Sequence, residues 1–342
     1  MTSLEAIAAQ LERWVIATFG PDHSSLNVDS LGGHSGITIG FDVVNKHATV
    51  ERLVLKIPPP GVQRKNNFDV LRQVPVLQSL ERRGIPAPRA RFWSDDESFF
   101  GAPYLIMSRL AGQSPPDLFR PVRPDSVGQE KISRSFREAV EVLADIHSMD
   151  TDSLLPGWEG YRPVDKEIAH WGRIFRKTKD NEWLKRGLAL QEKLIVKKPR
   201  SVPQGLTHGD YYSNNWVFKR GSLSGVVDWE GASIGPSLLD VGWLYMIYDR
   251  DSWGPTRRKT MYWQPSPEDL VEQYSRFASP SLKGNLDSLK WYRALAAFRI
   301  SSITAYYLEE HRSGRRVNEA WEVFGEAFPY LVGRANELLA EN

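Results

Sequence analysis

Cysteine is absent from this chain of 342 residues. Its absence excludes a disulfide framework and a thiolate metal site, and it agrees with a reducing cytosol. We also expect no signal peptide, because Glu5 and Glu12 interrupt the start and no apolar stretch follows a basic segment. No apolar run approaches the length that spans a bilayer. We therefore expect a cytoplasmic protein.

An excess of charge of one sign is missing as well. Lys and Arg total 44 residues and Asp and Glu total 42, which leaves a net charge of +2. Such a near balance gives no electrostatic argument for binding nucleic acid or an anionic membrane. We expect neither partner, and the sequence contains no signal for an oligomeric state.

Hydrophobic patterning in the first part of the chain predicts a small sheet. Residues 36–44 and 51–57 alternate apolar and polar side chains, as neighbouring antiparallel strands do. A helix is predicted at about 68–83, where Pro75 implies a kink or a late start, and a further strand follows. The chain begins with an amphipathic helix whose apolar side contains Leu4, Ile7, Leu11, Trp14 and Val15. These elements predict an N-terminal lobe over residues 1–110.

Helical periodicity dominates beyond a stretch with Pro and Gly at residues 112–128. Later helices are predicted near 267–277, 286–308 and 317–339. The second lobe is therefore predicted over residues 111–342. The whole pattern favours an α+β fold with a small antiparallel-sheet lobe and a larger, mainly helical lobe.

Two features of the N-terminal lobe could hold phosphates. In the turn at 31–37, Gly33 and Gly36 would let the backbone approach phosphates, and Ser35 could donate from its hydroxyl. Lys56 lies in a strand on the face opposite its apolar residues, where an ammonium could bind phosphates. Considered alone, each feature is better explained as an ordinary tight turn or a surface lysine.

Two segments of the later sequence carry candidate catalytic groups. Asp210 and Asn215 have the D-x-x-x-x-N spacing of a kinase catalytic loop, although chance produces that spacing about once in such a chain. Asp228 ends a short apolar strand, where its carboxylate could reach magnesium. Glu230 could assist the metal or pair with the scaffold.

The combination and order of these features resemble a known family. The motifs H-G-D at 208–210 with Asn215, D-W-E at 228–230, and the stretch 235–240 resemble the aminoglycoside phosphotransferase and choline kinase-like family. The resemblance extends from about Leu31 to the C-terminal helices. It implies a bilobal protein-kinase-like fold and an ATP- and Mg²⁺-dependent enzyme that phosphorylates a hydroxyl group of a small molecule.

The resemblance also implies roles for individual residues. Asp210 is the expected catalytic base, Asn215 and Asp228 are the expected Mg²⁺ ligands, and Asp240 is expected to brace the catalytic loop. The residues expected to bind ATP are Gly33, Ser35, Gly36, Lys56, Ser108 and Leu110, the last two through backbone contacts with adenine.

Two departures from related patterns affect this interpretation. The family carries a helical Glu that pairs with the strand lysine, whereas this chain has Gln73 at that position and Asp69 one turn earlier. A nucleotide-binding protein without catalysis is therefore an alternative. Gly209 replaces the Arg of the protein-kinase H-R-D motif, and an A-P-E segment is absent, which argues against a regulated protein kinase.

The acceptor is less clearly indicated. The turn at 31–37 and the stretch 267–299 resemble the subgroup related to acyl-CoA dehydrogenase fusion proteins, which implies an alcohol or hydroxyacyl acceptor. Ten of the 12 Trp residues follow residue 150, so they could line an apolar pocket, although core packing explains most Trp residues. An acidic patch would instead favour an aminoglycoside or macrolide resistance kinase; its candidates are Asp249, Asp251, Glu309 and Glu310.

Overall fold

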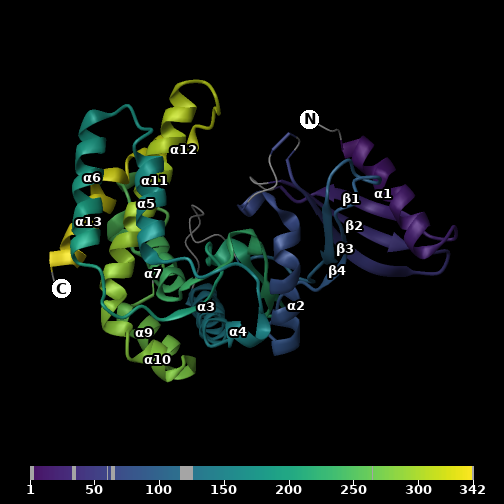
Figure 1. Cartoon of the computed structure of the whole chain (residues 1–342), viewed down its shortest axis with the longest axis horizontal. Helices are drawn as coiled ribbons and strands as arrows, with labels where there is room; N and C mark the ends of the chain where they lie inside the picture. The colour runs from purple at the N-terminus through teal and green to yellow at the C-terminus, as the bar shows by residue number, and fades with distance from the viewer. Residues whose placement is uncertain are drawn as a thin grey trace. The chain divides into compact units, whose positions relative to one another are not determined.

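The computed structural model describes residues 4–32, 36–59, 61–62, 66–115, 126–263 and 265–340. The chain forms two compact units: Met1–Gln113 with Ser224–Ala232, and Ser114–Leu223 with Ser233–Asn342. The first contains an antiparallel sheet and the second is mainly helical, which confirms the predicted α+β fold (Figure 1). The assignment of ATP-binding and catalytic roles to lobes 1–110 and 111–342 stays a prediction.

A five-stranded sheet forms the body of the first unit. Its strands are β1 (Ser24–Ser30), β2 (Ile37–Val44), β3 (Thr49–Ile57), β4 (Ala90–Ser94) and β5 (Tyr104–Ser108), in the order β1-β2-β3-β5-β4. Every neighbouring pair is antiparallel, and β2 pairs with β3 so that Thr38 lies opposite Lys56. The two alternating runs are therefore neighbouring antiparallel strands, as their sequence predicts.

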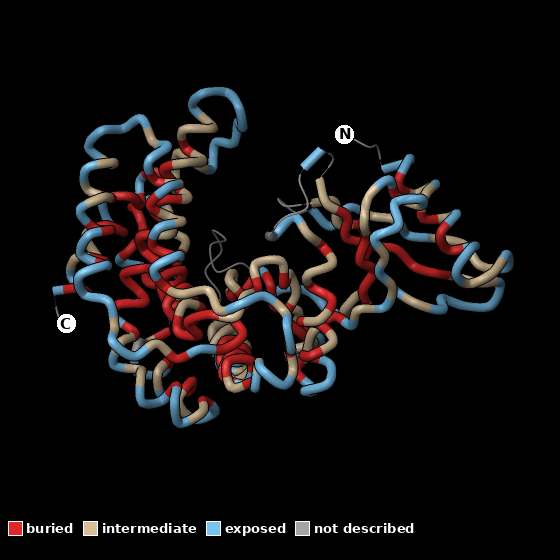
Figure 2. The backbone as a smooth tube through the Cα atoms, viewed as in Figure 1, coloured by how far each residue is buried: buried red, intermediate tan, exposed pale blue. Residues whose placement is uncertain are grey.

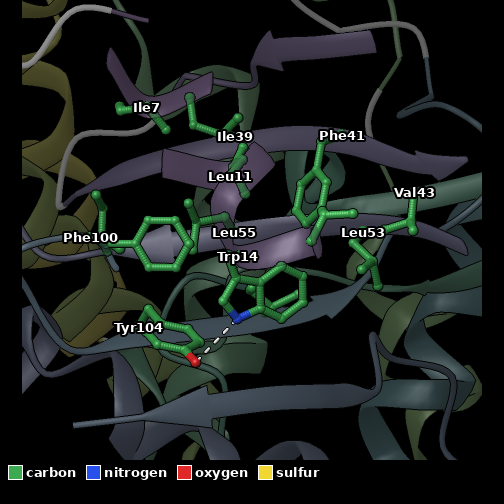
Figure 3. Packing of buried hydrophobic residues seen from close by; sticks show 13 residues of the cluster. Ile7, Leu11, Trp14, Ile39, Phe41, Val43, Leu53, Leu55, Phe100 and Tyr104 are labelled. Carbon is green, nitrogen blue, oxygen red and sulfur yellow. Dashed lines mark hydrogen bonds between the residues drawn. The ribbon is translucent and has the colours of Figure 1, made fainter. Parts of the chain in front are cut away.

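Helix α1 (Leu4–Phe19) covers one face of this sheet. Figure 3 shows Ile7, Leu11 and Trp14 of α1 packed with strand residues that include Leu53 and Leu55. Trp14 also donates from Nε1 to the Tyr104 hydroxyl at 3.2 Å. Leu4 begins the helix and is 44% exposed, whereas the other predicted residues of its apolar side are buried. Because side chains alternate along a strand, Lys56 lies on the other face of β3.

Helix α2 (Gln73–Arg83) starts later than the apolar pattern alone suggests. Two single-turn 3₁₀ helices, η1 (Asn66–Phe68) and η2 (Val70–Arg72), precede it. Pro75 then falls in the first helical turn, where its missing N–H breaks no intrahelical hydrogen bond. Gly84 ends the helix in the left-handed conformation, with φ of 74°. The predicted late start is confirmed.

The second unit is built from helices around two buried segments, α7 (Leu238–Tyr248) and α11 (Leu289–Arg312). Figure 2 shows the buried backbone of this helical unit in red. A Cβ atom on Gly242 would lie 2.7 Å from the Tyr292 backbone, so glycine allows α7 and α11 to approach closely. The remaining helices are α3 (Ser126–His147), α4 (Thr151–Leu154), α5 (Val164–Phe175), α6 (Asn181–Val196), α8 (Pro255–Arg258), α9 (Pro267–Phe277), α10 (Pro280–Lys283), α12 (Ala320–Gly325) and α13 (Phe328–Ala340).

The prediction of one helix near 317–339 is wrong, because α12 and α13 occupy this region. Gly325 ends α12 and Pro329 lies in the first turn of α13, where proline is compatible with a helix start but not with an interior. The predicted helices near 267–277 and 286–308 are confirmed as α9 and α11. Within the described residues, we find no helix with the length and apolar character that crossing a membrane requires.

Short strands connect the candidate loops to this scaffold. Strand β6 (Gln204–Thr207) pairs antiparallel with β9 (Ser233–Pro236), and β7 (Trp216–Lys219) pairs with β8 (Ser222–Val226). Single turns of 3₁₀ helix follow at η3 (Ser213–Asn215), η4 (Trp229–Gly231), η5 (Arg250–Ser252) and η6 (Leu286–Ser288). The D-x-x-x-x-N segment thus follows β6, and the D-W-E segment follows β8.

Candidate active site

Lys56 of β3 lies within an acidic pair in the first unit. Its Nζ donates to Asp228 Oδ1 at 2.6 Å and to Glu230 Oε2 at 2.9 Å. The residue is only 7% exposed, so the alternative of a surface lysine is wrong. Burial alone would lower the pKa of Lys56, but the charges and hydrogen bonds of Asp228 and Glu230 raise it above its ordinary value. Lys56 is therefore a charged, positioned ammonium.

Asp228 has an unusual backbone conformation. Its φ of 66° and ψ of 58° lie in the left-handed region, which is uncommon for a residue other than glycine. The turn is held on its C-terminal side by Trp229, which is buried and donates from Nε1 to the Val226 carbonyl at 2.8 Å. Val226 itself donates its N–H to the Pro86 carbonyl at 3.0 Å. Such a strained, firmly held carboxylate is typical of functional sites.

Arg72 fixes the backbone that follows Asp228. Its Nη1 donates to the Glu230 carbonyl and its Nη2 to the Ala232 carbonyl, each at 2.6 Å. Both acceptors are main-chain atoms far along the sequence, so no side-chain motif could have indicated this contact. Arg72 is a positioning residue that sequence reasoning missed.

The structure also clarifies the missing helical Glu. Gln73 is 2% exposed, and its Nε2 has no hydrogen-bond partner among the described residues. Asp69 caps η2 by accepting from the Leu71 N–H at 3.1 Å. Glu230 is instead the residue that joins Asp228 in neutralising Lys56. The D-W-E motif thus supplies the counter-charge that the N-lobe helix lacks.

Three of the other five residues predicted to bind ATP, Gly36, Ser108 and Leu110, are among the described residues. Gly33 and Ser35 lie outside the described residues. A Cβ atom on Gly36 would lie 2.6 Å from the Ile57 carbonyl oxygen, so close packing against β3 requires glycine there. Ser108 uses its N–H to donate to the Arg89 carbonyl at 2.9 Å, and its hydroxyl accepts from the Arg89 N–H at 2.9 Å. The predicted contact of Ser108 with adenine stays a prediction.

Leu110 follows directly in the connecting segment. Its side chain packs close to Gly225: a Cβ atom on that glycine would lie 2.7 Å from Leu110 Cδ1. Gly225 therefore gives the leucine side chain the room that any larger residue would occupy.

The second unit brings Asp210 and Asn215 together. Asn215 Nδ2 donates to the Asp210 carbonyl at 2.8 Å and to Asp210 Oδ2 at 3.2 Å. Asp210 donates its own N–H to His208 Nδ1 at 3.2 Å. Gly209 adopts a φ of 85°, which lets the chain turn sharply between His208 and Asp210. The D-x-x-x-x-N spacing therefore corresponds to one hydrogen-bonded loop.

Asp240 of α7 braces this loop, as the resemblance predicts. Its Oδ2 accepts from the His208 N–H at 2.6 Å and its Oδ1 from the Gly209 N–H at 2.9 Å. His147 Nε2 lies 3.3 Å from Asp240 Oδ2, and its Nδ1 lies 2.7 Å from the Tyr274 hydroxyl. Full burial would raise the pKa of Asp240, but the hydrogen bond and charge of His147, with the charge and N–H of His208, lower it.

The predicted metal ligands have suitable chemistry. Mg²⁺ prefers oxygen donors, and Asp228 offers a carboxylate. Asn215 uses its amide nitrogen toward Asp210, which leaves its amide oxygen for a cation. The described residues contain no group of three or more His, Cys, Asp or Glu residues that could hold a metal ion by themselves. Asp228 belongs to the first unit and Asn215 to the second, and their role as Mg²⁺ ligands stays a prediction.

The fold and these loops define a kinase-like phosphotransferase. Residues 35–272 match the phosphotransferase enzyme family, and the chain belongs to that family. The predicted family resemblance and the prediction of a small-molecule kinase are confirmed at this level.

Curated relatives share parts of the chain. It is 26% identical over 318 residues to the Arabidopsis thaliana protein named "Probable acyl-CoA dehydrogenase IBR3", covering 84% of this chain and 37% of that protein. It is 35% identical over 99 residues to homoserine kinase from Caulobacter sp. strain K31, covering 27% and 29% of the two chains. The chain thus spans about a third of the length of these relatives.

Solved structures share the fold. A candidate aminoglycoside phosphotransferase from Ralstonia eutropha JMP134 has a TM-score of 0.74 at 19% identity, with 97% of this chain and 98% of that chain covered. A thermostable APH(4)-Ia mutant in complex with AMP-PNP and hygromycin B has a TM-score of 0.59 at 16% identity, with 98% and 99% covered. At these identities the similarity shows the fold alone.

Proposed function

We propose that this enzyme transfers the γ-phosphate of ATP to a hydroxyl group of a small molecule and requires Mg²⁺. The observation that carries the proposal is the buried, charged Lys56 held by Asp228 and Glu230. A buried ammonium with two carboxylates is a prepared site for a phosphate chain and its metal ion. The ATP- and hygromycin-type ligands of the solved relative support the use of a nucleotide and a small acceptor.

The loop of the second unit supplies the proton acceptor. As the acceptor oxygen bonds to the γ-phosphorus, the bond between that phosphorus and the bridging oxygen of ADP breaks. The hydroxyl proton passes to the Asp210 carboxylate, which Asn215 orients through its amide. Asn215 and Asp228 would hold Mg²⁺, and the ion would neutralise phosphate charge. Lys56 binds phosphate oxygens, and Ser108 and Leu110 present backbone groups to adenine.

The acceptor is proposed to be an alcohol or a hydroxyacyl compound, not an aminoglycoside. The curated relatives include an acyl-CoA dehydrogenase and homoserine kinases, which supports a small hydroxyl compound. Cations already neutralise most of the acidic patch that a polycationic antibiotic would need. The pairs are Asp249 with Arg293 and Arg334, Glu309 with Lys179, and Glu310 with Arg315.

Replacement of Asp210 tests the proposed reaction. We expect Asp210→Ala to lower acceptor phosphorylation by about 100-fold or more, since general-base catalysis contributes roughly that factor. Affinity for ATP with Mg²⁺ should change little, because the substitution removes no proposed phosphate or metal ligand. Product formation by mass spectrometry and ATP binding by calorimetry measure the two effects separately. Wild-type turnover by the variant would disprove the assigned role of Asp210.

The same measurements test the alternative of a nucleotide-binding protein without catalysis. Calorimetric binding of ATP with Mg²⁺, combined with no transfer to any member of a broad alcohol panel, would favour that alternative. The counter-charge that Glu230 supplies to Lys56 removes its main motivation, which was the absence of a helical Glu.

A further inference from the structure

Arg299 of α11 is a cation that pairs with no carboxylate among the described residues of the second unit. Its Cζ lies 4.0 Å from the centroid of the Trp243 ring and 4.9 Å from that of the Trp171 ring. Within the described part of the chain, the buried Arg299 Nε has no hydrogen-bond partner, and no carboxylate forms an ion pair with Arg299 within 4.0 Å. Aromatic faces stabilise a guanidinium only in part, so the charge remains without a directly bonded anion.

A second unsatisfied donor lies beside it. Trp243 of α7 is 7% exposed, and its Nε1 has no hydrogen-bond partner among the described residues. A buried N–H without an acceptor costs free energy, and two such donors in contact are unusual in a native structure. Both donors would be satisfied by one group that accepts hydrogen bonds and carries negative charge.

One acidic side chain that acts electrostatically on Arg299 is already paired. Glu167 of α5 lies 2.5 Å from Arg162 through Oε1, and it accepts from Trp171 Nε1 through Oε2 at 3.0 Å. Both of its oxygens are therefore committed to groups other than Arg299.

The cluster is electrostatically coupled to the catalytic loop. Burial lowers the pKa of Arg299, and the carboxylates of Asp210, Glu167 and Asp240 oppose that shift, with Asp210 the strongest of the three. Arginine nevertheless stays charged at any ordinary pH. Trp243 lies on α7 three residues after Asp240, and Asp240 accepts from the N–H groups of His208 and Gly209, so the helix that carries this donor also braces the catalytic loop.

We propose that Arg299, together with the indole N–H of Trp243, binds a carboxylate or phosphate group of the phosphate acceptor. This assignment rests on the proposed kinase function and narrows its substrate class to anionic hydroxyl compounds. A guanidinium fork matches the paired oxygens of either group. The flanking rings of Trp171 and Trp243 exclude water and strengthen the contact. A polycationic acceptor would instead be repelled by the same residue.

A matched acceptor panel tests this proposal. The panel contains ω-hydroxy carboxylates, ω-hydroxyalkyl phosphates, neutral ω-hydroxy amides and ω-amino alcohols of equal chain lengths. We expect transfer to the carboxylates or the phosphates, and which of them reacts identifies the bound group. For that acceptor, Arg299→Met should raise KM by about tenfold or more and Trp243→Phe by a smaller factor, as expected for one charged and one neutral hydrogen bond. The KM for ATP should not change.

A matched control is available in Arg316, an exposed arginine that lies 6.0 Å from the Tyr307 ring. Arg316→Met should leave the acceptor KM unchanged, and Arg299→Lys should recover part of the lost affinity. Equal kcat/KM for neutral and anionic acceptors, with no effect of Arg299→Met, would overturn the assignment while leaving the kinase function intact.

Calorimetry separates failure of this inference from failure of the kinase function. The anionic compounds, with acetate and inorganic phosphate as minimal probes, are titrated into wild-type protein and Arg299→Met with an ATP analogue present. Binding that depends on Arg299 without any transfer supports the anion site and argues against the kinase function. Equal binding to both proteins, or no binding at millimolar concentrations, shows that the anion site does not exist.

Discussion

Lys56 and Arg299 are both secluded cations, but their surroundings differ. Lys56 has two carboxylates at hydrogen-bond distance, while Arg299 has two aromatic rings and no carboxylate within 4.0 Å among the described residues. The protein neutralises Lys56 with its own carboxylates. In our proposal, a ligand supplies the anion for Arg299. The difference teaches that a buried charge without a partner is a better indicator of a ligand site than a buried charge that is already paired.

The partners of Lys56 can be explained by its proposed task. A lysine that binds phosphates must stay protonated and must keep one position before ATP arrives. Asp228 and Glu230 fulfil both needs by raising its pKa and fixing its Nζ. Arg299 has a simpler task if it binds an anionic acceptor, because the acceptor brings the missing charge.

The largest expected effect on phosphate transfer comes from removing Lys56, the cation that has carboxylate partners. Lys56→Met should lower phosphate transfer by about 100- to 1000-fold, the range typical for loss of one electrostatic stabiliser of the transition state. Steady-state kinetics at saturating acceptor measures this loss. Lys46→Met is the control, because the Lys46 side chain is 80% exposed and its pairing with Asp22 is a surface contact. Equal losses of phosphate transfer in Lys56→Met and Lys46→Met would show that the carboxylate partners of Lys56 have no bearing on function.

Asp240 extends the comparison to a buried anion that has its partners. Asp240→Asn should lower the unfolding free energy at pH 7 by about 3 kcal/mol, since breaking a buried charged network is strongly destabilising. The pKa of Asp240 is lowered in the folded protein, so its contribution is present above the ordinary aspartate pKa and is lost as pH falls through the lowered value. Denaturant unfolding between neutral pH and about pH 3 measures both effects. A variant with an unchanged acid dependence would contradict this assignment.

The smallest expected effect distinguishes the two cations by the sign of a stability change. Glu230→Gln removes one partner of Lys56 and should lower the unfolding free energy by about 1 to 2 kcal/mol. Arg299→Met removes a charge without a directly bonded anion and should leave the unfolding free energy unchanged or raise it by about 1 kcal/mol. Equilibrium unfolding in denaturant, without ligands, measures both. A clear loss of stability in Arg299→Met would show that the arginine has a structural role.

The sequence by itself determined much of the local structure. Alternation of apolar residues in 36–44 and 51–57 predicts both strands and the face that carries Lys56, because side chains alternate along any strand. Pro75 and Gly84 predict the limits of α2, because each restricts or permits particular backbone angles. The motifs with Asp210, Asn215 and Asp228 predict the family that the comparison confirms. Apolar periodicity alone is misleading at 317–339, where Gly325 and Pro329 divide one periodic pattern into two helices.

Only the tertiary structure decided which charges have partners. Lys56 meets acids that lie 172 and 174 residues later, and Arg72 reaches carbonyls 158 and 160 residues later. The sequence of α11 does not set Arg299 apart from the other charged residues of that helix; only the packing of α5 and α7 places Trp171 and Trp243 beside it. Neighbouring residues encode periodicity and turns, but desolvation and pairing depend on how distant segments pack. The proposed anion site is therefore a property of the packed helices, whereas the catalytic motif is already visible in the sequence.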